Sequence, residues 1–300
     1  MPRGKTEKTL ELIRQSRAIY KSIHPASVRA GCYQLFVKEQ IKSMKKSATT
    51  GVGVQLRYAR ENGIIAWEWI VDDTRQMEDQ PGWESKEEFK RLWADSYCLQ
   101  RWLTQPIRVE VWSEKATVRG TLAPVLEKYG VGFLPLHGFS SVTTVHDVVA
   151  RQQRSNAVPL TIINVGDHDP SGLYMSLVDL PTRIAHMWEL SKSTASLNIT
   201  IEHVALTSKD CRNLPSFGAK KSDSRYAWYV KHYGDKAWEL DAMSPAILRR
   251  RVEQAILRQP IDWEAWQRVE LCSQAEQASL ENVLTTWARM KESISMQASE

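Results

Sequence analysis

The sequence predicts an α/β domain, built on a parallel-rich sheet flanked by helices, that follows a smaller α+β domain. Two patterns lead to this prediction. Strand-like runs alternate with helix-like segments along the middle of the chain, at 107–114, 117–130, 131–138, 140–154 and 158–169. Such alternation is typical of parallel strands joined by helices that cover the faces of a sheet. The second pattern is a set of three helix-like segments within the first 61 residues.

Length and composition agree with more than one domain. The chain has 300 residues, of which 42% are hydrophobic and 25% are charged, so it can bury a sizeable core. We expect a small α+β domain at 1–80, a linker helix at 81–105, the α/β domain at 106–245 and a helical C-terminal extension at 246–300. The start is charged and no apolar run approaches a membrane span, which predicts a cytoplasmic protein and no membrane partner.

The cysteines favour neither a zinc site nor a disulfide framework. Cys32, Cys98, Cys211 and Cys272 are scattered, and no two lie closer than 61 positions. Structural zinc sites and small disulfide folds need closely spaced pairs. We therefore interpret these four residues as separate thiols.

Basic residues concentrate at the N-terminus. The first 61 residues hold 13 Lys and Arg against four Glu, whereas the whole chain has a net charge of only +5. This asymmetry indicates either a polyanion-binding surface or a solvated basic helix face. The cations that we expect to contact DNA phosphates in this region are Lys42, Lys45, Lys46, Arg57 and Arg60.

The N-terminal segment follows the pattern of a winged helix-turn-helix. Helix-like stretches at 6–22, 28–41 and 49–61 precede a β-branched and aromatic run at 64–73, which suits a strand or a wing. The third helix would read duplex DNA in the major groove. Gly51 and Gly53 near its start make its first boundary uncertain.

Carboxylates follow two of the predicted strands. Glu114 ends the first strand, and Asp167 and Asp169 end the third. In an extended chain, positions i and i+2 point to the same side, so the two aspartates can present oxygens to one point. Such oxygens suit Mg²⁺, with Mn²⁺ as the alternative, bridging to a phosphodiester. The competing interpretation is an Asx turn that merely ends the strand.

The runs VEVWSEKATVRGTL, GVGFLPLHGFSS and TIINVGDHDPSG together resemble a toprim domain. Their form is closest to the A subunit of topoisomerase VI and the related meiotic double-strand-break proteins. The stretches VALTSKDCRNLPSF and WELDAM support the resemblance, which covers residues 106–245. It implies a metal site at Glu114, Asp167 and Asp169, and a preceding winged-helix domain.

The same resemblance implies a tyrosine nucleophile. The family has an Arg shortly before a Tyr-Tyr pair; here Arg29 precedes Tyr33, and Cys32 replaces the first tyrosine. Tyr33 would join the 5′ end of a DNA strand, with Arg29 holding a phosphate or favouring the phenolate and Glu114 also contributing to catalysis. The family's tyrosine acts at its partner's metal site, so a homodimer is implied. No ATPase segment occurs here, so gyration would need a separate subunit.

Two other functions stay open at this point. The first is a metal-dependent hydrolytic endonuclease that does not use Tyr33. The second is a non-catalytic DNA-binding protein on a toprim scaffold. Lys115, beside Glu114, would face the DNA phosphate or solvent. Glu239 and Asp241 could support the metal site or simply end a surface element, and His168 should point away from its two neighbouring aspartates.

Overall fold

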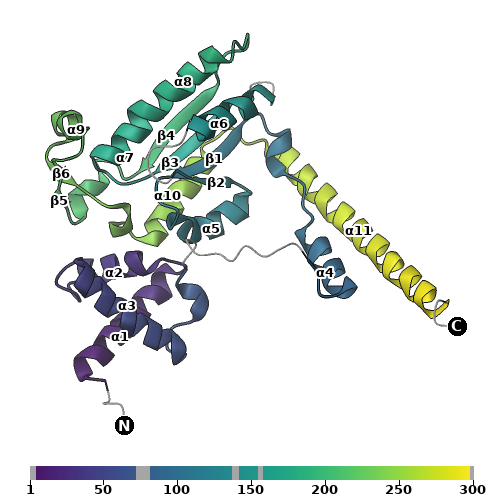
Figure 1. Ribbon diagram of the computed structural model, residues 1–300, viewed down its shortest axis with the longest axis horizontal. Coiled ribbons are helices and arrows are strands. Elements are labelled where there is room, and N and C mark those ends of the chain that lie inside the picture. The colour runs from purple at the N-terminus through teal and green to yellow at the C-terminus, as the bar shows by residue number, and fades with distance from the viewer. Residues whose placement is uncertain (1–4, 72–81, 137–141, 155–157, 298–300) are drawn as a thin grey trace. The chain divides into compact units, whose positions relative to one another are not determined.

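The computed structural model describes residues 5–71, 82–136, 142–154 and 158–297 (Figure 1). The chain forms two compact units. One combines Met1–Arg75 with Arg108–Gln259, and the other combines Gln76–Ile107 with Pro260–Glu300. No helix in the described ranges is both long and apolar enough to cross a membrane.

The first unit contains a four-stranded parallel sheet. Its strands are β1 (Arg108–Ser113), β2 (Gly132–Pro135), β3 (Leu160–Val165) and β4 (Ile199–Ala205). They lie in the order β2-β1-β3-β4, and every neighbouring pair is parallel. The predicted α/β architecture is therefore confirmed. All six residues of β3 are buried, as expected for an inner strand covered on both faces.

Helices cover the two faces of this sheet (Figure 1). The helices α6 (Val142–Arg154) and α8 (Leu180–Leu190) pack on each other and share a core with Trp112 and Ile162. On the other side, α5 (Val118–Tyr129) packs against α10 (Pro245–Leu257), which also contacts β3 and β4. The sheet is thus a buried layer that leaves only its edges available for a site.

The N-terminal part is a cluster of three helices, α1 (Glu7–Ile23), α2 (Val28–Val37) and α3 (Lys46–Glu61). The side chains of Thr6 and Ser27 cap the first two helices by accepting hydrogen bonds from Thr9 N and Ala30 N. The three helices enclose one apolar core. In the same unit, α2 packs against the short turn η5 (Leu240–Ala242), and this contact ties the helices to the sheet domain.

The strand expected at 64–73 is wrong for its described part. Residues Trp67–Trp69 form a 3₁₀ turn, η1, and Ile70 makes one isolated bridge to Ala26. The cause is Arg60, whose Nη2 donates to the carbonyl oxygens of Trp67 at 2.8 Å and Ile70 at 3.2 Å. These carbonyls are therefore unavailable to a strand partner.

An excursion of the chain follows β4. After the 3₁₀ turn η4 (Asp210–Asn213) come β5 (Phe217–Gly218), α9 (Tyr226–Tyr233) and β6 (Lys236–Ala237). The two short strands pair antiparallel, and Tyr229 is the buried centre of a small aromatic core. We call residues 214–238 the β5–β6 excursion. It packs on α7 (Pro170–Tyr174), which continues through the π-helical turn η3 (Met175–Asp179) into α8.

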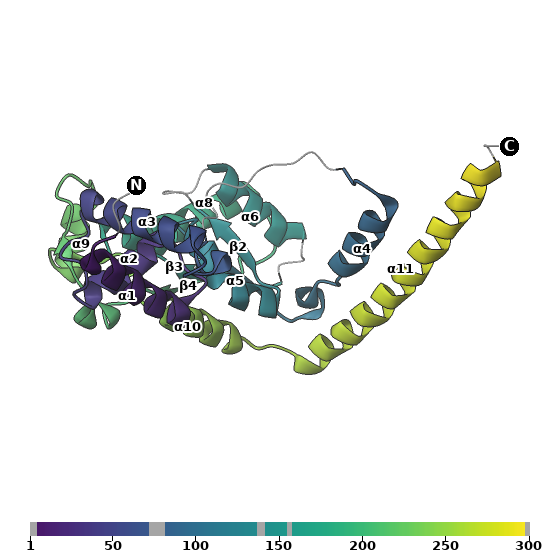
Figure 2. The ribbon, with the colours of Figure 1, turned by 90° about the horizontal axis from the view of Figure 1, so that it is seen from below.

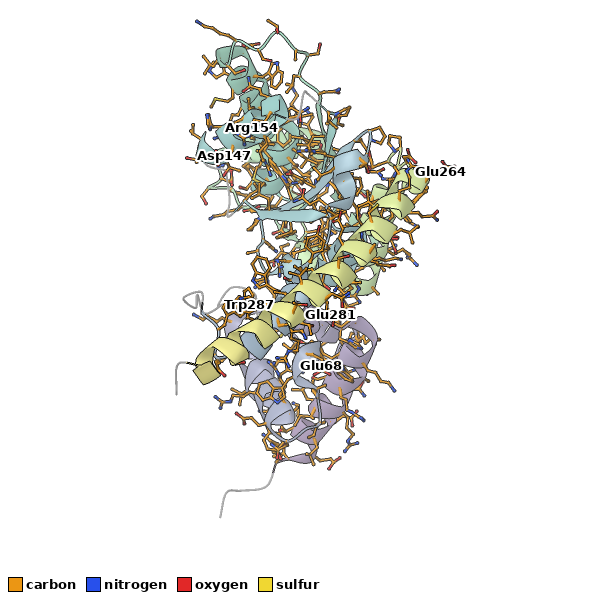
Figure 3. All side chains as sticks on the ribbon, turned by 90° about the vertical axis from the view of Figure 1, so that its right-hand side faces the viewer. Glu68, Asp147, Arg154, Glu264, Glu281 and Trp287 are labelled. Carbon is orange, nitrogen blue, oxygen red and sulfur yellow. The ribbon has the colours of Figure 1, made fainter. Side chains whose placement is uncertain are left out.

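The second unit consists of α4 (Lys86–Ser96), the 3₁₀ turn η2 (Arg101–Thr104) and the long helix α11 (Trp263–Gln297), seen from below in Figure 2. Aromatic contacts join them, between Phe89 and Trp287 and between Trp102 and Trp266. Figure 3 labels Glu264, Glu281 and Trp287 along α11. Residues from the expected linker helix and C-terminal extension thus pack on each other.

Two helical glycines provide a test of the N-terminal packing. A Cβ on Gly31 of α2 would lie 2.4 Å from Cζ of Tyr20, a fully buried ring whose hydroxyl donates to Ser27 O. We expect Gly31→Ala to lower the free energy of unfolding by about 1–3 kcal/mol through overpacking. At Gly53 of α3 a Cβ meets nothing within 4 Å, so Gly53→Ala should raise it by about 0.5–1 kcal/mol. Urea unfolding would measure both, and equal effects would contradict the packing of α1 on α2.

Candidate active site

The direction of the chain connections reverses between β1 and β3. The chain runs from β1 to its neighbour β2, then passes β1 to reach β3 and continues outward to β4. The connections that leave β1 and β3 therefore lie on opposite faces of the sheet. Ligands of open α/β sheets bind at the carboxyl ends of strands at such a reversal. Glu114 and Lys115 follow β1 directly, and Asp167 and Asp169 follow β3. The predicted acids therefore lie at the edge where a site is expected.

The turn after β3 holds the two aspartates in different ways. Asp167 Oδ1 accepts from Leu240 N at 2.7 Å. Asp169 caps α7, with its Oδ1 accepting from Gly172 N at 2.7 Å. The capping role expected as the alternative is thus present, and it occupies one oxygen of Asp169. Between them, His168 points away and its Nδ1 lies 2.8 Å from the buried Tyr229 hydroxyl.

Gly172 is needed for this turn. A Cβ at this position would lie 2.6 Å from the backbone oxygen of Asp167 and 3.2 Å from Asp169 Oδ1. Real Cβ atoms do not approach that closely, so the backbone of both aspartates would have to shift. The glycine of the DHDPSG run therefore permits the close approach that holds the two acids in place.

Glu114 is a half-buried carboxylate without a hydrogen bond or ion pair to any described residue. Burial raises its pKa, and the negative charges of Asp169 and Asp167 raise it further. Burial also raises the pKa values of Asp167 and Asp169. The three acids are thus close enough to repel one another while they are poorly hydrated, and a cation would relieve this repulsion.

Lys115 supplies part of the missing positive charge. Its Nζ lies 2.8 Å from Asp167 Oδ1, 3.0 Å from Asp241 Oδ2 and 3.8 Å from Glu239 Oε2. Burial lowers the pKa of Lys115, but the charges and hydrogen bonds of Asp241 and Asp167 outweigh it and raise this pKa. The amine was expected to face DNA phosphate or solvent; in this structure it is held among carboxylates instead.

Arg29 on α2 is also drawn into the cluster. Its Nε donates to Glu239 Oε2 at 3.0 Å and lies 3.4 Å from Asp241 Oδ2. Glu239 and Asp241, which the sequence left as either supporting acids or surface residues, thus connect α2 to Lys115. The signal was their position in WELDAM, but sequence spacing alone could not bring them next to Arg29, 210 positions earlier. We call Glu114, Asp167, Asp169, Glu239 and Asp241 the carboxylate cluster.

Tyr33 lies beside this cluster, in the same chain. Its side chain is fully buried, and its hydroxyl makes no hydrogen bond to any residue in the described ranges. The ring packs edge-on against Phe217 with centroids 6.4 Å apart, and the Arg29 guanidinium lies 5.7 Å from its centroid. Burial raises the pKa of the phenol, the Glu239 charge adds to this, and the charges of Arg29 and Lys115 only partly oppose it. The Arg29 charge therefore acts in the expected direction, toward the phenolate, but burial and the Glu239 charge outweigh it.

The other predicted DNA contacts differ in their environment. Lys42, Lys45 and Lys46 are partly or fully exposed near the start of α3 and form no ion pair with a described residue. Arg57 lies 3.8 Å from Glu61 on the exposed face of the same helix. Arg60 is engaged internally, and its guanidinium also stacks over Trp67. The run at 137–141, part of the quoted HGFSS segment, lies outside the described residues.

The acids at this edge of the sheet do not form a complete set of protein ligands for a divalent cation. No group of three or more His, Cys, Asp or Glu side chains in the described ranges is spaced to hold a metal ion around one point. Mg²⁺, however, commonly keeps several waters and takes only one or two protein carboxylates. The unpartnered Glu114, beside two aspartates with raised pKa values, fits that looser demand for a hard, oxygen-binding cation.

Comparison of the sequence with protein-family models gave no match, and a search of curated proteins also gave none. The function must therefore be argued from the site itself.

Glu114→Gln tests the electrostatics of the cluster. An acid whose pKa is raised in the folded state costs stability while ionised, so at pH 7 in EDTA the variant should be more stable than wild type. We expect a Tm increase of about 2–4 °C, which corresponds to ~1 kcal/mol. The difference should shrink as the pH falls and the wild-type acid gains its proton. Added Mn²⁺ should then raise the Tm of wild type more than that of the variant.

Glu127→Gln on α5 is the matched control, because this glutamate is exposed and forms no ion pair with a described residue. Glu127→Gln should change neither the Tm in EDTA nor the rise in Tm on addition of Mn²⁺. A variant at Glu114 that is less stable than wild type in EDTA would contradict the electrostatic account.

Proposed function

We propose that this protein is a Mg²⁺-dependent enzyme that cleaves phosphodiesters in duplex DNA at the carboxylate cluster. The observation that carries the proposal is the gathering of Glu114, Asp167 and Asp169 at the carboxyl ends of β1 and β3, with Glu114 unpartnered. The toprim resemblance assigns a metal to the same three residues. Mn²⁺ is the expected substitute ion.

The three acids would hold the ion, each from a strand end. When bound, the ion would neutralise charge on the phosphate and on the leaving oxygen. One oxygen of Asp169 accepts the hydrogen bond that caps α7, so its other oxygen would bind the ion. Lys115 would hold Asp167 in place through its 2.8 Å contact and offset part of the negative charge that repels DNA.

Water is the first candidate nucleophile. It would attack phosphorus, the bond from phosphorus to the 3′ oxygen would break, and the departing oxygen would gain a proton as the water loses one. The products are a 5′ phosphate and a 3′ hydroxyl. This route requires nothing of Tyr33, whose raised pKa and burial disfavour attack in the closed conformation.

Tyr33 is the second candidate nucleophile, and a specific observation favours it. A fully buried hydroxyl without a partner is costly, yet this one lies beside the carboxylate cluster. Its oxygen would bond to phosphorus, the bond to the 3′ oxygen would break, and the phenol proton would pass to the departing 3′ oxygen, with Glu239 as the candidate relay. The products are a 5′ phosphotyrosine and a 3′ hydroxyl. This route requires that α2 separate from η5 to admit DNA.

The finer assignments belong to the same proposal. They are a winged-helix role for α1–α3, a toprim identity for the sheet domain, a homodimer, and a separate ATPase subunit if DNA is also gyrated. Lys42, Lys45, Lys46 and Arg57 are the proposed phosphate contacts of the N-terminal helices. If wild type cleaves no DNA with either ion, a non-catalytic DNA-binding role replaces the enzyme.

Supercoiled plasmid incubated with Mg²⁺ or Mn²⁺ tests the reaction. We expect Asp167→Asn to reduce nicking and linearisation at least 100-fold, because it removes one of the acids assigned to the ion. Asp147→Asn, an exposed acid on α6 labelled in Figure 3, is the control and should cleave like wild type. Wild-type cleavage that survives both EDTA and Asp167→Asn would contradict the proposal.

The same gel separates the two nucleophiles. After SDS, DNA ends that migrate freely only when a protease is added carry covalent protein, and Tyr33→Phe should abolish them. Free ends that persist in Tyr33→Phe assign attack to water.

Arg29→Gln tests whether the charged contact keeps Tyr33 buried. Without its pairs with Glu239 and Asp241, the closed position of α2 should lose up to ~1 kcal/mol of stability. This loss corresponds to about a fivefold larger population in which α2 has moved away and exposed Tyr33. Nitration of Tyr33 by tetranitromethane, followed by peptide mass spectrometry, should therefore accelerate several-fold. Arg14→Gln, which loses pairs with two exposed glutamates of α1, is the control. An unchanged nitration rate would show that apolar packing alone covers the phenol.

A further inference from the structure

The β5–β6 excursion forms one border of the carboxylate cluster. Phe217 of β5 packs on Tyr33, and Trp238, directly after β6, forms a backbone bridge with His168 between the two aspartates. The excursion also contacts α7, the helix that Asp169 caps, through α9. The turn between β5 and α9, which holds Lys220 and Lys221, thus directly follows a strand that lies beside the cluster.

This border carries concentrated positive charge. Between 209 and 236 the chain has seven Lys and Arg against three Asp. Two of those acids are already paired, Asp210 with Arg251 and Asp223 with Arg225. Six cations of this stretch are exposed and form no ion pair with any described residue. They are Lys209, Arg212, Lys220, Lys221, Lys231 and Lys236.

The turn itself is a firm support for two of them. Asp223 accepts from Arg225 N at 2.9 Å and from Arg225 Nη1 at 3.2 Å, and its own N donates to Lys220 O at 3.0 Å. Tyr229, fully buried, anchors α9 with its hydroxyl 2.7 Å from Lys236 O. Lys220 and Lys221 therefore project from a fixed turn rather than from a loose loop.

A phosphodiester that approaches five carboxylates is repelled unless cations guide it. Lys115 and Arg29 cannot serve this purpose while they are paired inside the cluster. We infer that Lys220 and Lys221 bind the phosphate backbone of duplex DNA beside the cleavage site, as a contact separate from the N-terminal helices. This inference rests on the proposed function, because duplex DNA is the substrate proposed there. Such contacts position the strand without reading its sequence.

Fluorescence anisotropy with a fluorescein-labelled 20-base-pair duplex, in EDTA, tests this inference. Each lost phosphate contact should lower the slope of log Kd against log salt by about 0.9. K220Q/K221Q should therefore lose close to two units of slope and bind at least fivefold more weakly at 100 mM salt. The control R154Q/K192Q removes two exposed, unpaired cations that lie at the ends of α6 and α8, away from the carboxyl edge.

K45Q/K46Q on α3 separates the two surfaces, and its loss should add to that of K220Q/K221Q. A second measurement needs no variant: acetylation of Lys220 and Lys221 in wild type should slow when duplex is present. The inference is overturned if K220Q/K221Q matches the control within twofold, if neither lysine is protected, or if wild type does not bind duplex in EDTA. The anisotropy experiment measures DNA binding without metal, whereas the plasmid assay measures cleavage. Failure of this inference can therefore be told apart from failure of the proposed function.

Discussion

The carboxylate cluster is the constraint on which the first unit depends. Five acids from two strand ends and the η5 turn meet at one edge of the sheet, and Lys115 and Arg29 pair directly with three of them, Asp167, Glu239 and Asp241. Partly buried charges that repel one another are tolerated only with counter-charges close by. Helix α2, which contributes Ala30, Cys32 and Leu35 to the helical core, also delivers Arg29 to Glu239. Tyr33, one helical turn after Arg29, is buried beside the same ion pair.

The elements that local pattern determines were predictable from the sequence. The alternation of apolar runs indicated the parallel sheet, because buried strands such as β3 leave a continuous apolar signature. Glu114, Asp167 and Asp169 could be placed at one edge for the same reason, since carboxyl ends of parallel strands coincide. The contacts of Glu239 with Arg29 and of Asp241 with Lys115 could not be predicted, because they join residues more than 120 positions apart.

The strand expected near Trp67 shows where a prediction from local sequence pattern fails. Its β-branched and aromatic residues favour a strand locally, but Ile65 and Ile70 are buried in the helical core and Arg60 takes up two carbonyls of the segment. A side chain expected to bind phosphate therefore determines the backbone of its own domain. Strand propensity is a statement about fit to a half-buried pleated surface, and tertiary packing overrides it when that surface is absent.

Stability and reactivity oppose each other at this site. The closed arrangement satisfies Glu239 and Asp241 with Arg29, and by doing so it covers the phenol and raises the phenol pKa. A divalent cation near Glu114 and Asp167 would add positive charge to a cluster whose acids already pair with Lys115 and Arg29. Those two cations would then gain less free energy from their carboxylates, so binding of the proposed ion would weaken the pairing that holds α2. The carboxylates that would position the ion would also couple its arrival to the exposure of Tyr33.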